Sequence, residues 1–258
     1  MRIYILSDNK IVSPRPRGLK AEWGLSIYLD LDEPILLDCS QSDSAFNNMK
    51  VLKLKEPKKI VLSHGHYDHT GGLKNFLGKG VQIYAHSNAF FPRTFKGEEV
   101  GIPYSKEEIE NFSKINVISE PFKIQKNVWI LGEIPRTHEE ALLEDSFMMG
   151  KPDRILDDTS IVVKTEKGLV LVLGCCHSGF RNTVKYAEEV LNDEVRFIVG
   201  GTHLIAFKDL REILEWIEKK EFELVAPCHC TGMLNEFLLK QRLGENCLIV
   251  GSGSKIEI

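Results

Sequence analysis

Residues 63–72, SHGHYDHTGG, constrain this chain more than any other segment, because they place three histidines and an aspartate within six residues. The segment follows an apolar run at 60–62 that is typical of a short buried strand, and its glycines lead into a predicted helix from Leu73. Polar side chains gathered on a loop at the carboxyl end of a strand indicate a functional site in an α/β protein.

The spacing within this segment predicts a transition-metal site. His64 and His66 lie two residues apart, so an extended loop directs both to the same side and toward one ion. Asp68 and His69 follow where the chain turns and can bind a second ion, while Gly65 lets the backbone bend. Imidazoles with one carboxylate suit zinc, iron or manganese better than calcium or magnesium. Four such side chains at this spacing argue against the alternative, a loop of solvated histidines.

Composition limits the classes of protein to consider. The 258 residues suffice for one large domain, and 43% hydrophobic with 27% charged residues is ordinary for a globular chain. A net charge of −4 without a basic run argues against nucleic-acid binding, and no apolar run is long enough to span a bilayer. The N-terminus enters a strand without the layout of a signal peptide, so we expect a cytoplasmic protein. We expect its partner to be a small-molecule substrate.

The six cysteines indicate neither a disulfide framework nor a zinc ribbon. A cytoplasmic location disfavours disulfides, and no pair has CxxC spacing. Four of the six instead flank histidines, in the segments 175–177 and 228–230.

The order of predicted elements indicates a single α/β domain over residues 1–258. The expected strands are 2–7, 24–31, 34–38, 81–85, 127–131, 160–163, 169–173, 195–199 and 224–226, with edge strands at 246–251 and 255–258. The expected helices are 43–53, 72–77, 105–113, 181–191, 207–218 and 233–240. Residues 86–126 are an aromatic, proline-bearing insertion, interpreted as a lid or pocket wall, with a plain surface excursion as the alternative.

Three further histidines each follow an apolar β run: His177, His203 and His229. One histidine can end a strand by chance. The same placement on several strands predicts that these strand ends meet at one edge of the fold.

HGHYDH resembles the HxHxDH motif of the metallo-β-lactamase superfamily. Together with GCCHSG, GGTHL and PCHCTG, it resembles a subfamily of metal-dependent hydrolases and dihydropterin synthase-like proteins. The resemblance implies a four-layer αββα sandwich, two mixed β-sheets with helices on both outer faces. It also implies one or two divalent transition-metal ions at one edge, with zinc first and iron or manganese as alternatives.

The resemblance also implies roles for individual residues. One ion would be held by His64, His66 and His177, and the other by Asp68, His69 and His229. Asp68 would in addition orient the attacking water as a base. An aspartate in the position of Asp38 supports the metal loop in the superfamily, and a simple turn aspartate is the alternative.

Two departures from the family pattern concern the ligands. Cys175 stands where the superfamily has an aspartate that bridges both metals, so either its thiolate binds or His177 supplies the ligand. The middle histidine, expected before residue 160, is absent. An aspartate of the pair 157–158 replaces it, His138 reaches in from a loop, or the site holds a single ion.

Several polar residues are candidates for contacts with substrate. Ser178 and Thr231 precede predicted helices, whose N-termini bind anions, and Arg136 lies in an irregular segment with Arg93 and Arg154. These features favour a phosphate-bearing substrate, and helix capping with solvent-facing arginines is the alternative. His203 joins Asp68 as a catalytic candidate, as an outer metal contact or a substrate-binding histidine.

The resulting hypothesis is a metal-dependent hydrolase that attacks an ester or phosphoester-type substrate through metal-bound hydroxide. The first alternative is a dihydropterin synthase-like transferase that displaces diphosphate from a pterin substrate. The second is an iron redox protein or a non-catalytic metal-binding module.

Overall fold

The computed structural model describes residues 1–78, 80–138 and 146–258, and the chain divides into two compact units. Unit 1 comprises Met1–Ile118, Glu144–Asp153 and Val250–Ile258, and unit 2 comprises Ser119–Leu143 and Arg154–Ile249. The single domain expected over the whole chain stays a prediction.

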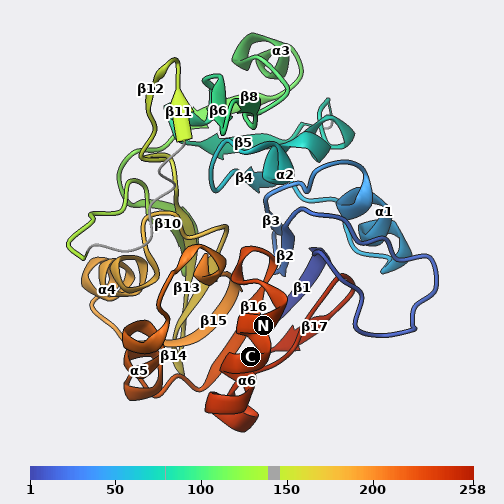
Figure 1. The fold of residues 1–258 in the computed structure, drawn as a ribbon. Helices are drawn as coiled ribbons and strands as arrows, with labels where there is room; N and C mark the ends of the chain where they lie inside the picture. Colours follow the sequence, from blue (N-terminus) through green and yellow to red (C-terminus); the bar gives the residue numbers. More distant parts are fainter. Residues whose placement is uncertain (79, 139–145) are drawn as a thin grey trace. The chain divides into compact units, whose positions relative to one another are not determined.

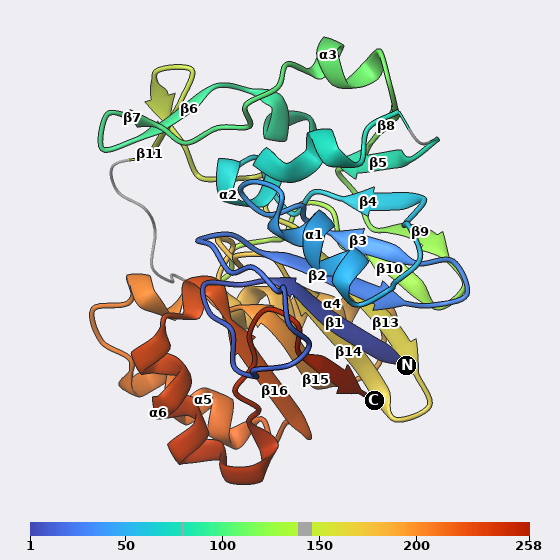
Figure 2. The same cartoon turned by 90° about the vertical axis from the view of Figure 1, so that its right-hand side faces the viewer.

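Unit 1 is organised around a mixed seven-stranded sheet in the order β17-β1-β2-β3-β4-β5-β8 (Figure 1). Its strands are β1 (Arg2–Ser7), β2 (Ser26–Asp30), β3 (Ile35–Leu37), β4 (Lys59–Val61), β5 (Gln82–Ala85), β8 (Lys114–Val117) and β17 (Lys255–Glu257). The four strands from β3 to β8 are mutually parallel, so their carboxyl ends meet at one edge. Helix α1 (Ser44–Val51) lies against this sheet in both views, and its Ala45 and Met49 enter the core of the unit (Figure 2).

The helix expected at 72–77 begins earlier than the sequence suggested. Helix α2 (Tyr67–Thr70) starts inside the histidine segment and continues as the 3₁₀ helix η1 (Gly71–Asn75). The two glycines are required here because the chain after β3 passes directly against them. A Cβ on Gly71 would lie 2.1 Å from the oxygen of Gln41, and one on Gly72 would lie 2.0 Å from the oxygen of Cys39.

The expected insertion at 86–126 is partly absorbed into the sheets. It contains η2 (Ser87–Phe90), β6 (Arg93–Phe95), β7 (Glu98–Glu99), α3 (Lys106–Glu110), β8 and β9 (Phe122–Gln125). Strands β6 and β7 join β11 (Ser146–Met148) and β12 (Lys151–Pro152) in a small four-stranded sheet, whereas β8 and β9 are edge strands of the two larger sheets. A lid role for this region stays a prediction.

Unit 2 is built on a six-stranded sheet in the order β16-β15-β14-β13-β10-β9. Its other strands are β10 (Val128–Ile130), β13 (Ser160–Thr165), β14 (Gly168–Leu173), β15 (Val195–Gly201) and β16 (Leu224–Cys228). Strands β14, β15 and β16 are parallel neighbours. Helices α4 (Phe180–Leu191), α5 (Arg211–Lys219) and α6 (Met233–Leu243) contribute to one core with Leu169, Leu171 and Leu173 of β14.

Two expectations for unit 2 are wrong. The amphipathic segment 207–218 becomes helical only from Arg211, because 3₁₀ helix η3 (Leu204–Ala206) and an extended Phe207 precede it. Residues 246–251 form no named strand. The 3₁₀ helix η5 (Gly244–Asn246) precedes Cys247, which makes a single bridge to Val225.

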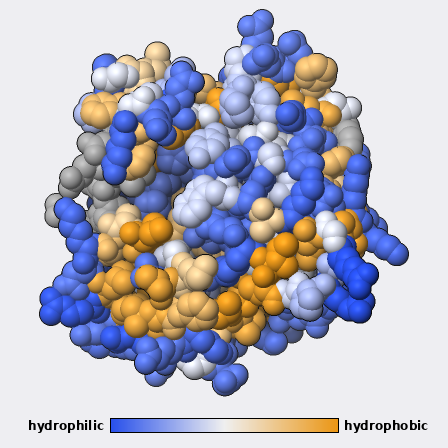
Figure 3. Space-filling model, turned by 45° about the vertical axis from the view of Figure 1, so that its right-hand side comes forward, coloured by the Kyte–Doolittle hydropathy of each residue, from blue (hydrophilic) through white to orange (hydrophobic). Residues whose placement is uncertain are grey.

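The surface is polar with local hydrophobic areas, which Figure 3 shows gathered across the lower part of the face it views. In unit 2, four exposed hydrophobic side chains follow the candidate ligands closely in sequence: Ile205, Met233, Leu234 and Phe237. Within the described residues, no helix combines the length and the hydrophobicity needed to cross a membrane.

Candidate metal centre

In unit 1, the adjacent strands β3 and β4 bring Asp38 and Ser63 together. These residues follow the paired ends Leu37 and Val61, and both are fully buried. The backbone N–H of Ser63 donates to Asp38 Oδ1 at 2.7 Å, and its hydroxyl donates to Asp38 Oδ2 at 2.6 Å. Asp38 adopts a left-handed backbone with φ of 60°, which a non-glycine residue keeps only where its surroundings enforce it.

This buried carboxylate sets the orientation of two histidine rings. His69 Nδ1 lies 2.7 Å from Asp38 Oδ2 and donates to it. The Ser63 hydroxyl already donates to Asp38, so its oxygen accepts from His64 Nδ1 at 2.9 Å. Both rings therefore carry their proton on Nδ1 and present Nε2 as the basic nitrogen, an arrangement that carboxylates commonly impose on metal-binding histidines.

The remaining donors of the segment lie beside these two rings. His64 Nε2 and His66 Nδ1 are 2.9 Å apart, close to the separation of about 3.3 Å between two nitrogens on one tetrahedral zinc ion. Asp68 Oδ2 lies 3.9 Å from His69 Nε2, and the His64 and His69 ring centroids are 4.2 Å apart. The predicted donors from residues 64–69 thus gather in unit 1, as the spacing indicated.

Glycine is required at position 65 for steric reasons as well as for backbone flexibility. A Cβ at this position would lie 2.2 Å from the backbone oxygen of Ala89, because η2 packs directly against the loop. His86 caps that 3₁₀ helix through Nδ1, which accepts the N–H of Asn88 at 3.1 Å.

In unit 2, the carboxyl ends of three parallel strands supply a second group of donors. Cys175 and His177 follow β14, His203 follows β15, and His229 and Cys230 follow β16. The ligand atoms of Cys175, His177 and His203 lie within 4.8 Å of one another, as do those of Cys175, His229 and Cys230. These five residues, called the unit 2 cluster below, are all buried.

The unit 2 cluster has the properties of a site prepared for a ligand. His203 is only 8% exposed, yet neither ring nitrogen has a hydrogen-bond partner of ordinary geometry among the described residues. His203 and His229 both have left-handed backbones, with φ of 56° and 53°. An unbonded buried imidazole and strained loop residues are costly to folding, and both are explained by a bound metal ion.

The surroundings also favour a thiolate. Burial raises the pKa of the Cys230 thiol, but contacts with Cys175, His203 and His229 outweigh burial and lower that pKa well below its ordinary value. Thiolate and imidazole together suit zinc or iron, so the donor chemistry of unit 2 fits a transition metal.

Asp158 lies in the region where the family pattern expects a histidine, and it binds the loop that carries His177. Its Oδ2 accepts the N–H of Ser178 at 2.8 Å, next to His177. Burial raises the pKa of Asp158 to about 6, although hydrogen bonds from Ser178 oppose the rise. His138 lies elsewhere, with Nε2 2.6 Å from Lys185 Nζ, and it belongs to none of the metal-capable groups among the described residues.

The polar candidates for substrate binding differ in their surroundings. The Ser178 N–H, expected to meet a phosphate, is bound to Asp158. The Thr231 hydroxyl contacts that of Thr202 at 3.0 Å and accepts its N–H at 3.2 Å, which joins the ends of β15 and β16. Arg93 is buried, donates to the Asn88 oxygen at 2.9 Å and lies 3.6 Å from Asp153, so its function is structural.

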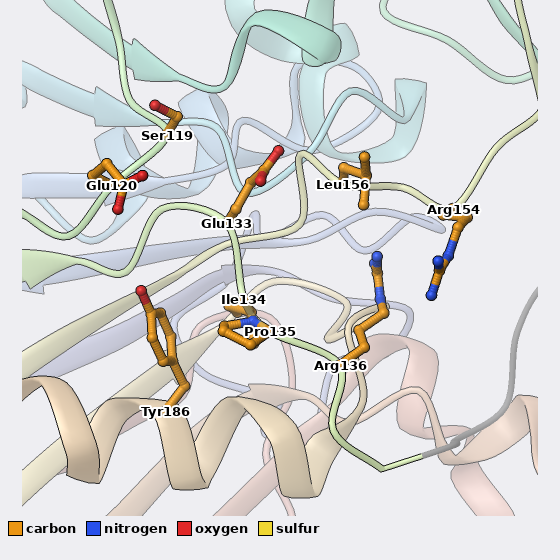
Figure 4. A pocket seen from close by; sticks show the side chains of 9 residues that line it. All are labelled: Ser119, Glu120, Glu133, Ile134, Pro135, Arg136, Arg154, Leu156 and Tyr186. Atoms are coloured by element: carbon orange, nitrogen blue, oxygen red, sulfur yellow. The ribbon is translucent and has the colours of Figure 1, made fainter.

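Arg136 and Arg154 instead line a pocket of about 470 Å³ in unit 2. Figure 4 shows their guanidinium groups extending toward the same region, with Tyr186 and Glu120 lying apart from them in this view. Arg136 Nη2 also donates to the oxygen of Ile155 at 3.0 Å and reaches Ser178 Oγ at 3.4 Å. This contact connects the pocket to the loop that carries His177.

Two residues at these sites, Ser63 and Cys230, were not assigned from the sequence, and Asp158 was considered only as a replacement for the missing histidine ligand. Ser63 and Asp158 act through hydrogen bonds that spacing does not reveal. Cys230 could have been found, because it follows the end of β16 just as Cys175 follows the end of β14, and both flank histidines. Joint binding of one ion by His64, His66 and His177, or by Asp68, His69 and His229, stays a prediction.

Comparison with known proteins gives consistent matches. The model of the metallo-beta-lactamase superfamily matches residues 26–146. An uncharacterized protein of Methanocaldococcus jannaschii is 32% identical over 242 residues, covering 89% of this chain and 90% of its own. The 7,8-dihydropterin-6-methyl-4-(β-D-ribofuranosyl)-aminobenzene-5′-phosphate synthase of the same organism is 27% identical, covering 95% and 92%. The crystal structure of a metal-dependent hydrolase of the β-lactamase superfamily superposes with a TM-score of 0.89 at 29% identity, covering 100% of this chain and 99% of that one.

Proposed function

This chain belongs to the metallo-β-lactamase superfamily, and on that premise we propose that it is a metal-dependent hydrolase of an ester or phosphoester that carries an anionic group. The fold class predicted from the sequence is confirmed by the structural match. We further propose that the donors of each unit bind divalent metal ions, one or two in total, with zinc as the first candidate.

The observation that carries the proposal is the buried relay in unit 1. Asp38 holds His69 directly and His64 through Ser63, so that both rings present Nε2. Orienting two imidazoles in this way requires a buried carboxylate, which costs folding free energy. A histidine with a purely structural function does not require that cost. A bound divalent ion would supply a water of lowered pKa and polarise the scissile bond of the substrate. Asp68, whose Oδ2 lies 3.9 Å from His69 Nε2, is our candidate for the base that orients the attacking water.

Features of unit 2 support the substrate class. Two guanidinium groups in the pocket of about 470 Å³ provide charge for a phosphate or carboxylate. The exposed Ile205 and Met233, which follow the ligand loops, provide apolar contact area for an organic leaving group. His203, which is only 8% exposed and belongs to the unit 2 cluster, is the second catalytic candidate, as an outer metal contact or a substrate-binding histidine.

The test is metal analysis of protein purified without added metal, followed by assay on a panel of phosphomonoesters, phosphodiesters and carboxylic esters. We expect up to two equivalents of zinc, iron or manganese and hydrolysis that stops when a chelator removes them. Protein that reaches full metal occupancy and hydrolyses none of these esters would contradict the proposed hydrolase.

A transferase is the second candidate, favoured by the relative named as a dihydropterin synthase. In this reaction the bond from a pterin methyl carbon to diphosphate breaks, diphosphate leaves, and an aminobenzene compound forms the new bond to carbon and loses a proton. Arg136 and Arg154 would bind the leaving diphosphate. Oxygen from labelled water appears in the product only if the reaction is a hydrolysis, whereas a pterin–arene adduct appears only if it is a transfer.

A further inference from the structure

Two thiols of the unit 2 cluster meet although a strand separates the strands that carry them. Cys175 follows β14 and Cys230 follows β16, with β15 between. The Cys230 thiol donates to the Cys175 backbone oxygen at 3.3 Å. The last residue of β15, Gly201, makes this approach possible, because a Cβ there would lie 2.6 Å from Cys230 Sγ.

The neighbouring donors complete a soft ligand set. Sγ of Cys175 and of Cys230 and a ring nitrogen of His229 lie within 4.8 Å of one another. The ligand atoms of Cys175, His177 and His203 also lie within 4.8 Å of one another. All of these residues belong to unit 2, and Cys175 and Cys230 are each only 4% exposed.

An independent observation points to a ligand at this place. Neither ring nitrogen of His203 has a hydrogen-bond partner of ordinary geometry among the described residues, and a polar group in contact with the ring is the Cys230 thiol. Buried polar groups in folded proteins are bonded in the great majority of cases, so an exception calls for an absent partner. A metal ion between the thiols and the histidines would be that partner.

We propose that Cys230 is a metal ligand and that, with Cys175 and His229, it forms a thiolate-bearing position that His203 completes. The inference rests on the proposed metal-dependent function and predicts which metal the protein prefers. Two thiolates select zinc or ferrous iron over manganese and magnesium. Binding replaces each S–H proton by a bond to the metal and releases the protons to solvent, with no oxidation or reduction.

Cobalt(II) titration of the metal-free full-length protein tests this assignment. Thiolate ligands give cobalt an intense near-ultraviolet charge-transfer absorption that nitrogen and oxygen ligands do not. We expect this absorption in the wild type, a loss of about half of it in Cys230→Ser and in Cys175→Ser, and no change in Cys176→Ser. Cys176 is the matched control, because it is a buried neighbour whose thiol donates to Thr183 Oγ1 at 3.3 Å.

A second measurement needs no variant and does not depend on folding of mutants. X-ray absorption of the zinc-loaded wild type should contain a sulfur shell at about 2.3 Å beside nitrogen and oxygen at about 2.0 Å. Stoichiometric zinc without a sulfur shell, or a Cys230→Ser protein with the cobalt spectrum of the wild type, overturns the proposal while leaving the hydrolase intact. Absence of any bound metal overturns the proposed function as well.

Discussion

The two units carry their candidate ligands in different ways. Unit 1 places four donors within the six residues 64–69, on one loop and the helix turn that follows it. Unit 2 assembles its five donors from three loops that are up to 55 residues apart, at the ends of neighbouring parallel strands. A contiguous motif can be recognised in the sequence, whereas a dispersed one becomes a group only through strand order.

The donors also differ in chemistry. Unit 1 offers imidazole nitrogens and a carboxylate, whereas unit 2 offers two thiols with its imidazoles. Behind each group lies a fully buried aspartate. Asp38 binds a ring nitrogen and fixes side-chain orientation, whereas Asp158 binds the backbone of Ser178 and fixes the path of the loop. Similar placement at strand ends therefore serves two different ligand sets.

The largest effect is expected from removing one direct donor on each side of the comparison. His64→Ala and His229→Ala should each lower activity more than about 100-fold, since loss of an outer partner of a ligand already costs about 10- to 100-fold. The measurement is initial rate together with bound metal per chain.

The histidine control for this pair is His86→Ala, which removes a helix cap rather than a donor. If only one of the two donor variants loses metal and activity, only the unit that carries it contributes a working metal ligand.

The second effect concerns Asp158 and stability. Its pKa of about 6 in the folded protein exceeds the ordinary value of 3.8, so its protonation favours the folded state. This contribution is fully present below a pH of about 4 and is lost as the pH rises through about 6, a change on the order of 3 kcal/mol. In metal-free Asp158→Asn, urea unfolding should lack this decline between those pH values. Identical pH profiles for variant and wild type would remove Asp158 as a buried acid.

The third effect distinguishes the two aspartates. Asp38→Asn presents an amide to the rings and misorients His69, so zinc affinity should fall about 10- to 100-fold, or about 1.4 to 3 kcal/mol. Competition with a chromophoric chelator measures this. Asp43→Asn, at an exposed residue paired with Lys20, should leave the affinity unchanged. An equal effect of both variants would refute the relay.

The smallest effect is expected in the pocket of unit 2. Arg154→Ala removes one exposed charge, so KM for a phosphoester should rise less than about tenfold while kcat stays near the wild-type value. Steady-state kinetics at two salt concentrations provide the measurement. Arg196→Ala, which loses a surface pair with Glu223, is the control, and equal KM values in both variants would exclude the pocket from substrate binding.

The fold family and the histidine segment could be predicted from the residues alone. Apolar runs predicted most strands to within a few residues. The spacing of residues 64–69 predicted a group of metal donors, because residues so close in sequence stay close in any fold. Helix boundaries beside glycines were less predictable, as α2 shows, since packing of the Gln41 and Cys39 backbone against Gly71 and Gly72 decided them.

Which distant side chains meet could not be predicted from the residue order. The order of β14, β15 and β16 brings Cys230 to Cys175, and the pairing of β3 with β4 brings Asp38 to Ser63 and His69. The structure also buries Arg93 beside Asp153 and leaves Arg136 and Arg154 to line a pocket, although the sequence offered all three as equal candidates. The physical reason is that burial and hydrogen-bond partners depend on strand pairing across long sequence separations, which local residue patterns do not encode.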